Sequence, residues 1–320
     1  MVHSFDFRDL PALRALASRG ISLDSRTCLT RDLHILRTAL LAQWVPEIIP
    51  ETLMLHGADG AAGFAQLGHR RGESCAWLRF LAPRELFRDD RGIELLEALL
   101  HTAGRRHAQQ ILADAEEKTE EIGFLRRMGF SIYARQEIWK GTPPFRQPPS
   151  TPKGEFRALH SGNAQAALAL YCSIVPALVN QVEGFPKRPR GWLIYEESEP
   201  VGFFNQHEGP RGLWMEPIFH PEARNAAEWI ACWLGGLNLR PPDPVYVCVR
   251  SYQDWVGPIL RDNGFSLMSR RAALIRRVVV PVPVAEGLPL SAVDKPVPQA
   301  TTYTSSVNRK AYDSATAHHR

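Results

Sequence analysis

Phe124-Leu-Arg-Arg-Met-Gly-Phe130 opens an alternating, strand-like run in the first half of this chain. A similar stretch, Ile259-Leu-Arg-Asp-Asn-Gly-Phe265, opens a second such run roughly 135 residues later. In both copies a short helix with one apolar face ends at a glycine, Gly129 or Gly264, where helices often need a left-handed residue. A repeat of this length is about the size of a whole domain, so the sequence predicts two similar domains in tandem.

Other landmarks repeat in the same order, at offsets of about 135 to 150 residues. Each half has a Phe-Arg pair before a helix-like stretch, a Gly-Phe pair in a strand, and a proline that ends a strand before a long amphipathic helix. These pairs are Phe7-Arg8 and Phe156-Arg157, Gly63-Phe64 and Gly202-Phe203, and Ala82-Pro83 and His220-Pro221.

The composition is that of an ordinary globular protein, with 320 residues, 44% hydrophobic and 22% charged residues, and a net charge of +4. Arginine pairs such as Arg70-Arg71 and Arg276-Arg277 are scattered along the chain instead of forming a stripe. We therefore expect no nucleic-acid partner. A weaker alternative, nucleic-acid binding through these pairs and a flexible tail, would show a steep salt dependence.

Cysteine usage indicates a reducing compartment, and hydropathy gives no sign of a membrane segment. The 5 cysteines are odd in number, and none forms a CxxC pair, so neither a disulfide framework nor a zinc site is expected. No apolar run is long enough to span a bilayer, and the first residues lack the basic segment followed by an apolar segment that is typical of a signal peptide. We expect a cytoplasmic protein with no membrane partner.

Two proline-rich stretches divide the chain. We predict an N-terminal domain over residues 1–142, a linker over 143–154, a C-terminal domain over 155–282 and a disordered tail over 283–320.

Hydrophobic periodicity predicts the elements within each half. The first half reads as strand, two helices, three strands, long helix, strand, short helix and strand, over residues 3–8, 9–19, 30–44, 51–56, 62–70, 74–81, 92–107, 110–115, 120–128 and 130–140. Thr30 is the expected cap of the second helix. The second half repeats most of this order, with helices over 163–178 and 223–237 and a strand over 245–250.

This order of elements, with its strand–Pro–helix and helix–Gly-Phe–strand junctions, resembles the GNAT acyltransferase superfamily. The resemblance covers residues 3–140 and, more weakly, 155–280. It implies an α/β (α+β) fold of two tandem GNAT-like domains, each a mixed, mostly antiparallel twisted sheet flanked by helices. The residues that carry it are Leu81-Ala82-Pro83, Arg91-Gly92-Ile93, Leu95-Leu96, and the stretches 124–130 and 259–265.

The resemblance implies acetyl-CoA as co-substrate, held between two splayed central strands with its diphosphate on the N–H groups that begin the long helix. On this basis the cofactor-binding residues would be Leu81, Arg88, Arg91, Gly92 and Ile93. The family has a phosphate-binding motif that begins with Arg or Gln, has Gly three positions later, and ends with Gly or Ala two positions after that. This motif is incomplete here, because acidic residues replace its first and last positions. Those residues are Asp89 and Glu94. The segment 220–226 of the second half has no glycine.

Catalytic candidates are few. The tyrosine that many relatives use to protonate the leaving thiolate is replaced by Leu125 and Leu260. Glu216, on a strand expected to flank the acyl group, is a candidate base, and Tyr252 is a candidate cleft residue, although an outward-facing strand glutamate and a packed loop aromatic are the simpler alternatives. Glu73 and Glu116 are weaker candidates. His69 and His207 lack metal-ligand spacing, so no metal is expected.

The leading hypothesis is an acetyl-CoA-dependent N-acyltransferase that acetylates a primary amine of a small molecule or peptide, with the cofactor in the N-terminal half. The alternative is a catalytically inactive tandem GNAT-like binding or sensing module, favoured by the missing tyrosines and the incomplete phosphate motif. The chain is expected to be a monomer or a homodimer.

Overall fold

The computed structural model describes residues 1–42, 44, 50–58, 60–70, 72–145, 152–186, 189–237 and 243–278. All of these lie in one compact unit, Met1–Pro281. The predicted tail over 283–320 and residues 146–151 of the predicted linker lie outside the described residues, and the domain boundaries stay predictions.

The described elements alternate as expected between short helices and strands. The strands are β1 (Val2–Ser4), β2 (Ile21–Ser22), β3 (Glu51–Gly57), β4 (Gly60–Gly68), β5 (Cys75–Ala82), β6 (Gln110–Glu116), β7 (Ser131–Gly141), β8 (Glu155–Ala158), β9 (Gly191–Glu196), β10 (Glu199–Gly209), β11 (Gly212–Phe219), β12 (Val245–Arg250) and β13 (Ser266–Arg277). The helices are α1 (Leu10–Ala17), α2 (Ser25–Arg31), α3 (Ile35–Ala42), α4 (Asp90–Arg105), α5 (Glu120–Arg127), α6 (Ala164–Ile174), α7 (Ala177–Glu183), α8 (Ala226–Gly235) and α9 (Val256–Asp262), with 3-10 turns η1 (Phe7–Asp9), η2 (Arg84–Arg88) and η3 (Ser251–Gln253).

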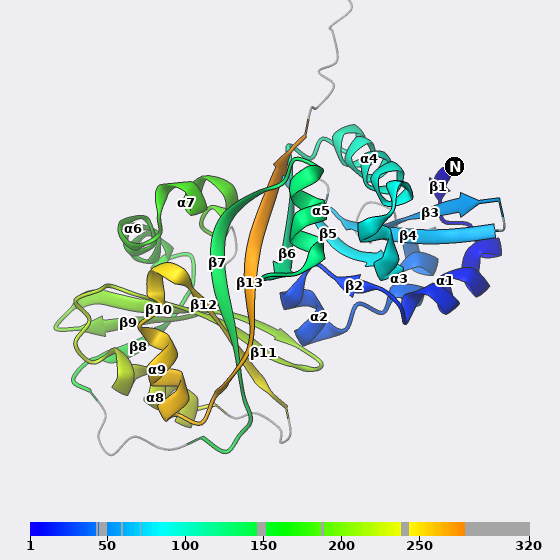
Figure 1. Cartoon of the computed structure of the whole chain (residues 1–320). Coiled ribbons are helices and arrows are strands. Elements are labelled where there is room, and N and C mark those ends of the chain that lie inside the picture. Colours follow the sequence, from blue (N-terminus) through cyan, green and yellow to red (C-terminus); the bar gives the residue numbers. More distant parts are fainter. Residues whose placement is uncertain are drawn as a thin grey trace, which may run out of the picture. The chain divides into compact units, whose positions relative to one another are not determined.

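The strands form a single sheet in the order β1-β3-β4-β5-β6-β13-β7-β12-β11-β10-β9-β8, with β2 added to β5. The two halves exchange their last strands. β13, from the end of the second half, pairs with β6, while β7, from the end of the first half, pairs with β12. β7 and β13 also pair with each other and lie side by side where the halves join (Figure 1). The predicted fold class, a mixed and mostly antiparallel sheet flanked by helices, is confirmed.

Each half of the sheet is covered on both faces. In the first half, α4 and α5 pack on one face and α1 and α3 on the other. In the second half, α8 and α9 cover one face, and α6 and α7 cover the other. Within the described residues, no helix is long and apolar enough to cross a membrane.

The repeated glycines end their helices as the sequence predicts. Gly129 and Gly264 have φ of 79° and 86°, in the left-handed region. In each copy, the N–H of the following phenylalanine donates to a carbonyl five residues back, from Phe130 to Leu125 and from Phe265 to Leu260. This C-terminal motif satisfies helix carbonyls and turns the chain into the last strand.

Two predicted helices are each broken in two. Residues 30–44 do not form one helix, because Asp32 and His34 adopt positive φ between α2 and α3. The prediction of Thr30 as a cap is wrong, since Thr30 lies inside α2 and its hydroxyl donates to the Arg26 carbonyl. Residues 163–178 divide into α6 and α7 at Pro176, which lacks the N–H that a continuous helix needs. The predicted strand over 3–8 ends at Ser4.

Candidate functional site

In both halves, two neighbouring parallel strands pair only at their beginnings. β5 and β6 pair up to Trp77 and Leu112, and β11 and β12 pair up to Met215 and Val247. Beyond these points the strands separate. We call the two openings the first split, between β5 and β6, and the second split, between β11 and β12. These are the places where a GNAT fold would hold acetyl-CoA, so their contents decide whether that molecule fits.

The first split is filled by the chain itself. β2 pairs antiparallel with the end of β5, with Ile21 opposite Leu81. Leu23, which follows β2, bridges the opening. Its N–H donates to the Arg79 carbonyl of β5 at 2.8 Å, and its carbonyl accepts from the Asp114 N–H of β6 at 2.9 Å. The Leu23 side chain is fully buried in the core under α4. The backbone groups of Leu81 and its neighbours, predicted to face the cofactor, thus face β2.

The start of α4 is also occupied. The Asp89 carboxylate accepts from the Arg91 N–H at 2.9 Å, and the Gly92 N–H donates to the Asp89 carbonyl at 2.9 Å. The Arg91 guanidinium donates to the same carboxylate at 2.5 Å, and this bond is the main cause that lowers the pKa of Asp89. Asp89 therefore takes two of the N–H donors that a diphosphate would need, one through its carboxylate and one through its carbonyl.

The remaining predicted cofactor residues have structural partners. Arg88 pairs with Glu120. A Cβ on Gly92 would lie 2.0 Å from the Leu86 carbonyl oxygen, so this glycine lets η2 pack against α4. Ile93 packs against the first core. The residues of the first split do not fit acetyl-CoA.

The second split is closed by one side chain. The Gln253 amide accepts from the Phe219 N–H and donates to the Phe219 carbonyl, both at 3.0 Å. Gln253 is 1% exposed. It thus takes both backbone groups of Phe219, which lie on β11 beyond its last pair with β12. At the start of α8, Asn225 makes no side-chain cap but donates to the Glu196 carboxylate at 3.0 Å. A carboxylate at this position opposes a diphosphate, so the residues of the second split do not fit acetyl-CoA either.

A cavity of about 300 Å³ lies between the halves, and both predicted catalytic residues line it. The carboxylate of Glu216 accepts from Asn205 Nδ2 at 3.0 Å and from Trp214 Nε1 at 2.9 Å. Burial acts to raise the pKa of Glu216, but the Arg250 and Arg26 guanidiniums outweigh it and hold this pKa below its ordinary value. Glu216 is therefore a half-buried, ionised carboxylate that lines the cavity, and not an outward-facing strand residue.

Arg250 faces Glu216 across the cavity. Its Nη2 donates to Glu183 at 2.5 Å, and Glu183 also accepts from the Tyr133 hydroxyl at 2.5 Å. Within the described residues, Arg250 Nη1 is buried without a hydrogen-bond partner, as is Asn205 Oδ1. Buried polar atoms are normally paired, and Arg250 and Asn205 both line the cavity, so an unpaired donor and an unpaired acceptor lie at its wall.

Arg26 links the halves on the other side of the cavity. It lies on α2, 5.7 Å from the Trp77 ring, and its Nη1 lies 3.5 Å from Nε2 of His207 on β10. Burial, and then Arg26, lower the pKa of His207 to about 4. His207 is therefore neutral at neutral pH and adds no charge to the cavity.

Tyr252 lies in η3, beside the same cavity. Burial raises the pKa of Tyr252, so its phenol is neutral and can donate a hydrogen bond. Of the weaker candidates, Glu73 lines the cavity and Glu116 does not belong to its lining. Nε2 of His69 lies 2.8 Å from the Glu73 carbonyl oxygen. Three other residues of the cavity were not predicted from the sequence, because they lie far apart in the chain and form no recognisable motif. They are Arg26, Asn205 and Arg250.

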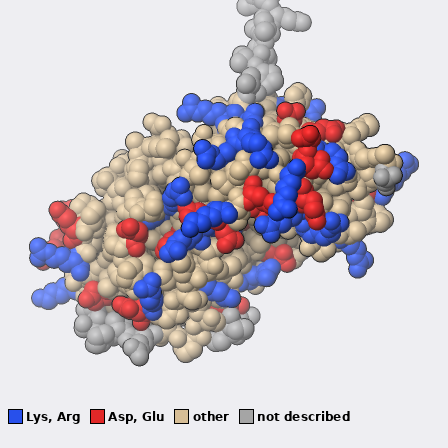
Figure 2. All heavy atoms as spheres, in the orientation of Figure 1, with Lys and Arg blue, Asp and Glu red and all other residues tan. Residues whose placement is uncertain are grey.

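Charge on the molecular surface is mixed. On the face in Figure 2, Lys and Arg side chains alternate with Asp and Glu and form no basic stripe. Several described arginines are neutralised locally, as in the pairs Arg84–Glu120, Arg84–Glu121 and Arg135–Glu117. This face therefore gives no support to a nucleic-acid interface.

Comparison with solved structures shows the fold. The chain is similar to a GCN5-related N-acetyltransferase from Sphaerobacter thermophilus, with 14% identity, 88% of this chain and 96% of the other covered, and a TM-score of 0.53. It is similar to a tandem GNAT protein from the clavulanic acid biosynthesis pathway, with 14% identity, 88% and 99% covered, and a TM-score of 0.52. No protein-family model and no curated protein matches the sequence. The chain has the GNAT fold.

Proposed function

We propose that the protein is a small-molecule binding module of the GNAT fold, and that its ligand is a zwitterion held in the cavity between the halves. The observation that carries the proposal is the pair of buried, unpartnered atoms there, Arg250 Nη1 and Asn205 Oδ1. A ligand carboxylate would accept from Arg250, because guanidinium and carboxylate form charge-assisted hydrogen bonds. A ligand ammonium group would donate to Asn205 and Glu216.

The charge of the cavity supports a ligand without net charge. Glu183 and Glu216 lie among Arg250 and Arg26. Asp24 and Asp114 also line the cavity, but they pair with Arg79 and Arg271, and Glu73 is exposed. Four carboxylates are thus balanced by four guanidiniums. An uncompensated ion would be costly in such a buried site, whereas a zwitterion brings its own counter-charge. A volume of about 300 Å³ is at the small end for ligand pockets and suits a molecule of the size of an α-amino acid.

Thermal denaturation of the full chain with the common α-amino acids tests the proposal. A ligand at about 100 times its Kd adds about 2.7 kcal/mol of stability. We expect at least one zwitterion to raise Tm, and its N-acetylated and decarboxylated counterparts to fail, because each lacks one of the two charges. Glu216→Gln and Arg250→Lys should abolish the shift, while Glu208→Gln, at an exposed position of β10, should not.

The proposal is wrong if no zwitterion raises Tm at millimolar concentration, or if the N-acetylated and decarboxylated forms act equally well. Loss of the shift in Glu208→Gln as well would mean that the variants act through general destabilisation.

Acetyl-CoA-dependent N-acyl transfer to a primary amine, the activity that the resemblance implies, is a second candidate. One observation favours it: the ionised Glu216 stands one residue beyond the last β11–β12 pair, at the mouth of the second split. Since the split as it stands does not fit acetyl-CoA, this activity requires Gln253 to leave Phe219 and the Glu196 carboxylate to move away from the start of α8. Release of CoA from acetyl-CoA on addition of an amine, lost in Glu216→Gln, would establish this activity; a binding module releases none.

A further inference from the structure

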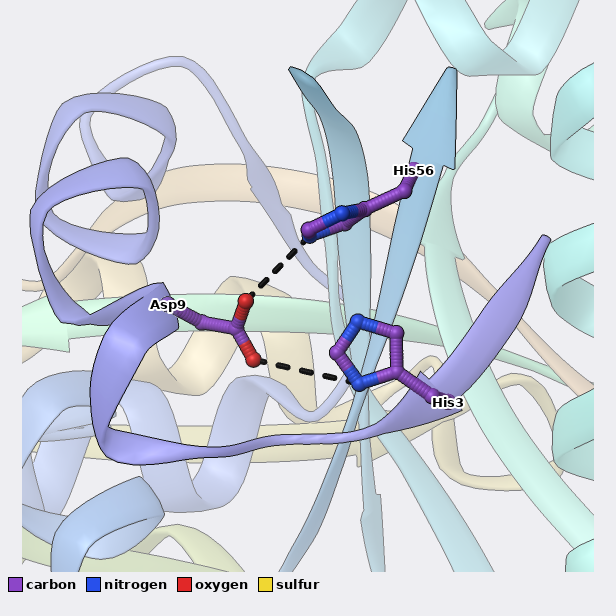
Figure 3. Close-up of side chains that lie close together, drawn as sticks. All are labelled: His3, Asp9 and His56. Carbon is purple, nitrogen blue, oxygen red and sulfur yellow. Dashed lines mark hydrogen bonds and ion pairs between the residues drawn. The ribbon is translucent and has the colours of Figure 1, made fainter. Parts of the chain in front are cut away.

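Two histidines and an aspartate meet at the edge of the first half, away from both splits. His3 lies on β1, Asp9 ends η1 and His56 lies on β3. Figure 3 shows both imidazoles and the carboxylate turned toward one another. His56 Nε2 is 3.2 Å from Asp9 Oδ1, and His3 Nδ1 is 3.9 Å from Asp9 Oδ2. One ligand atom from each residue lies within 4.8 Å of the other two.

The carboxylate of Asp9 is buried without a permanent counter-charge. Asp9 is 5% exposed, yet among the described residues its ion-pair partners are only the two imidazoles. Its Oδ2 accepts from the Asp6 N–H at 2.9 Å, which fixes its orientation but supplies no charge. Buried carboxylates are normally paired with a cation or bound to a metal. A cation between Asp9 and the two rings would supply the missing charge.

The surroundings of the rings suit metal ligation. His3 Nδ1 also lies 2.8 Å from the Ser4 carbonyl oxygen. This contact holds the ring in place, and the ring nitrogen that does not bond to a carbonyl keeps a lone pair for an ion, as is usual for metal-binding histidines. The ring centroids of His3 and His56 are 4.7 Å apart in an edge-to-face arrangement, so neither ring covers the other. Both side chains are partly exposed, at 33% and 39%, which leaves a path for an ion and its water.

We propose that His3, Asp9 and His56 form a binding site for one divalent transition-metal ion, with Zn²⁺ as the probe. Two imidazoles and one carboxylate are ligands that Zn²⁺ accepts in proteins, and three protein ligands leave a further position for water. The ion would tie β1 and η1 to β3. The proposal does not depend on the ligand of the central cavity, because the two sites share no residue.

Competition titration with a chromophoric chelator tests the site. The full chain is used without a polyhistidine tag, because a tag beside His3 would bind the metal itself. We expect one Zn²⁺ per chain, and an affinity that falls at least about tenfold in His3→Ala and in His56→Ala. The matched control is His101→Ala, which removes an exposed histidine of α4 and should leave the affinity unchanged. Zn²⁺ should also raise Tm in the parent chain and not in His56→Ala.

Asp9→Asn is a third variant, but the loss of its bond to Asp6 can disturb folding, so the two histidine variants decide the matter. Absorption of the Co²⁺-loaded chain distinguishes this site from the cysteines. We expect no thiolate charge-transfer band. The proposal is overturned if Zn²⁺ does not bind, if both histidine variants bind it as tightly as the parent, or if Co²⁺ shows a thiolate band.

Discussion

The first and second splits are the same feature of one fold, closed in two different ways. In the first, a stretch of backbone enters the opening, pairs with β5 and reaches β6 through Leu23. In the second, a single amide side chain, Gln253, pairs with both backbone groups of Phe219. The first filler cannot leave without unpairing β2 and emptying part of a core, whereas the second could leave by rotation of one side chain. The second split is thus the more easily opened, and the ionised Glu216 lies beside it.

The largest effect is expected in the first split. Leu23→Ala removes a fully buried side chain and should cost about 2–5 kcal/mol of unfolding free energy, because the cavity left behind cannot fully collapse. Chemical denaturation measures it. The matched control is Leu178→Ala, at a leucine of α7 that is 53% exposed, where little change is expected. A loss in Leu23→Ala no larger than in the control would contradict the filled split.

A smaller effect is expected in the second split. Gln253→Met keeps the shape of the side chain but leaves the Phe219 N–H and carbonyl without their partner. Unpaired buried groups cost about 1–3 kcal/mol, and the same denaturation assay detects this loss. Gln181→Met, at an exposed position of α7, is the control. If Gln253→Met proved as stable as the parent chain, the amide would not be closing the split.

The cavity beside the second split should also respond to pH. Burial and Arg26 lower the pKa of His207 from 6.5 to about 4, so the folded state favours the neutral ring. Its contribution to stability is complete above a pH of about 6.5 and is lost as the pH falls toward about 4. We expect a loss of about 1–3 kcal/mol over this window, which His207→Gln removes and His101→Gln does not. Equal pH slopes in the parent and His207→Gln would refute this assignment.

Much of the architecture could be predicted from the sequence because its signals are local. The Gly-Phe junctions specify where helices end, and the alternation of residues specifies strands. The exchange of β7 and β13 could not be predicted, because the alternation of residues in a strand does not say which strand it pairs with. In the structure Arg271 of β13 lies opposite Glu116 of β6, a residue far away in the sequence. Residues 21–24 carry no periodic signal, so nothing in them indicated that they fill the first split.

The candidate site was predicted in part. Glu216 and Tyr252 line the cavity, although acetyl-CoA was expected in the first half, where Asp89 caps α4. The departures from the family motif at Asp89 and Glu94 were visible in the sequence, but only the structure shows that the carboxylate bonds to the helix N–H. His3, Asp9 and His56 come from three elements and match no linear motif.

Amide hydrogen exchange, with and without millimolar acetyl-CoA, tests most directly whether the protein fills both of its own splits. We predict slow exchange at the N–H groups of Leu23, Asp114 and Phe219 in the free chain, because all three are bonded within the splits, and no change on addition of acetyl-CoA. Fast exchange at Leu23 and Phe219, or new protection at the start of α4 or α8 with acetyl-CoA, would contradict the account.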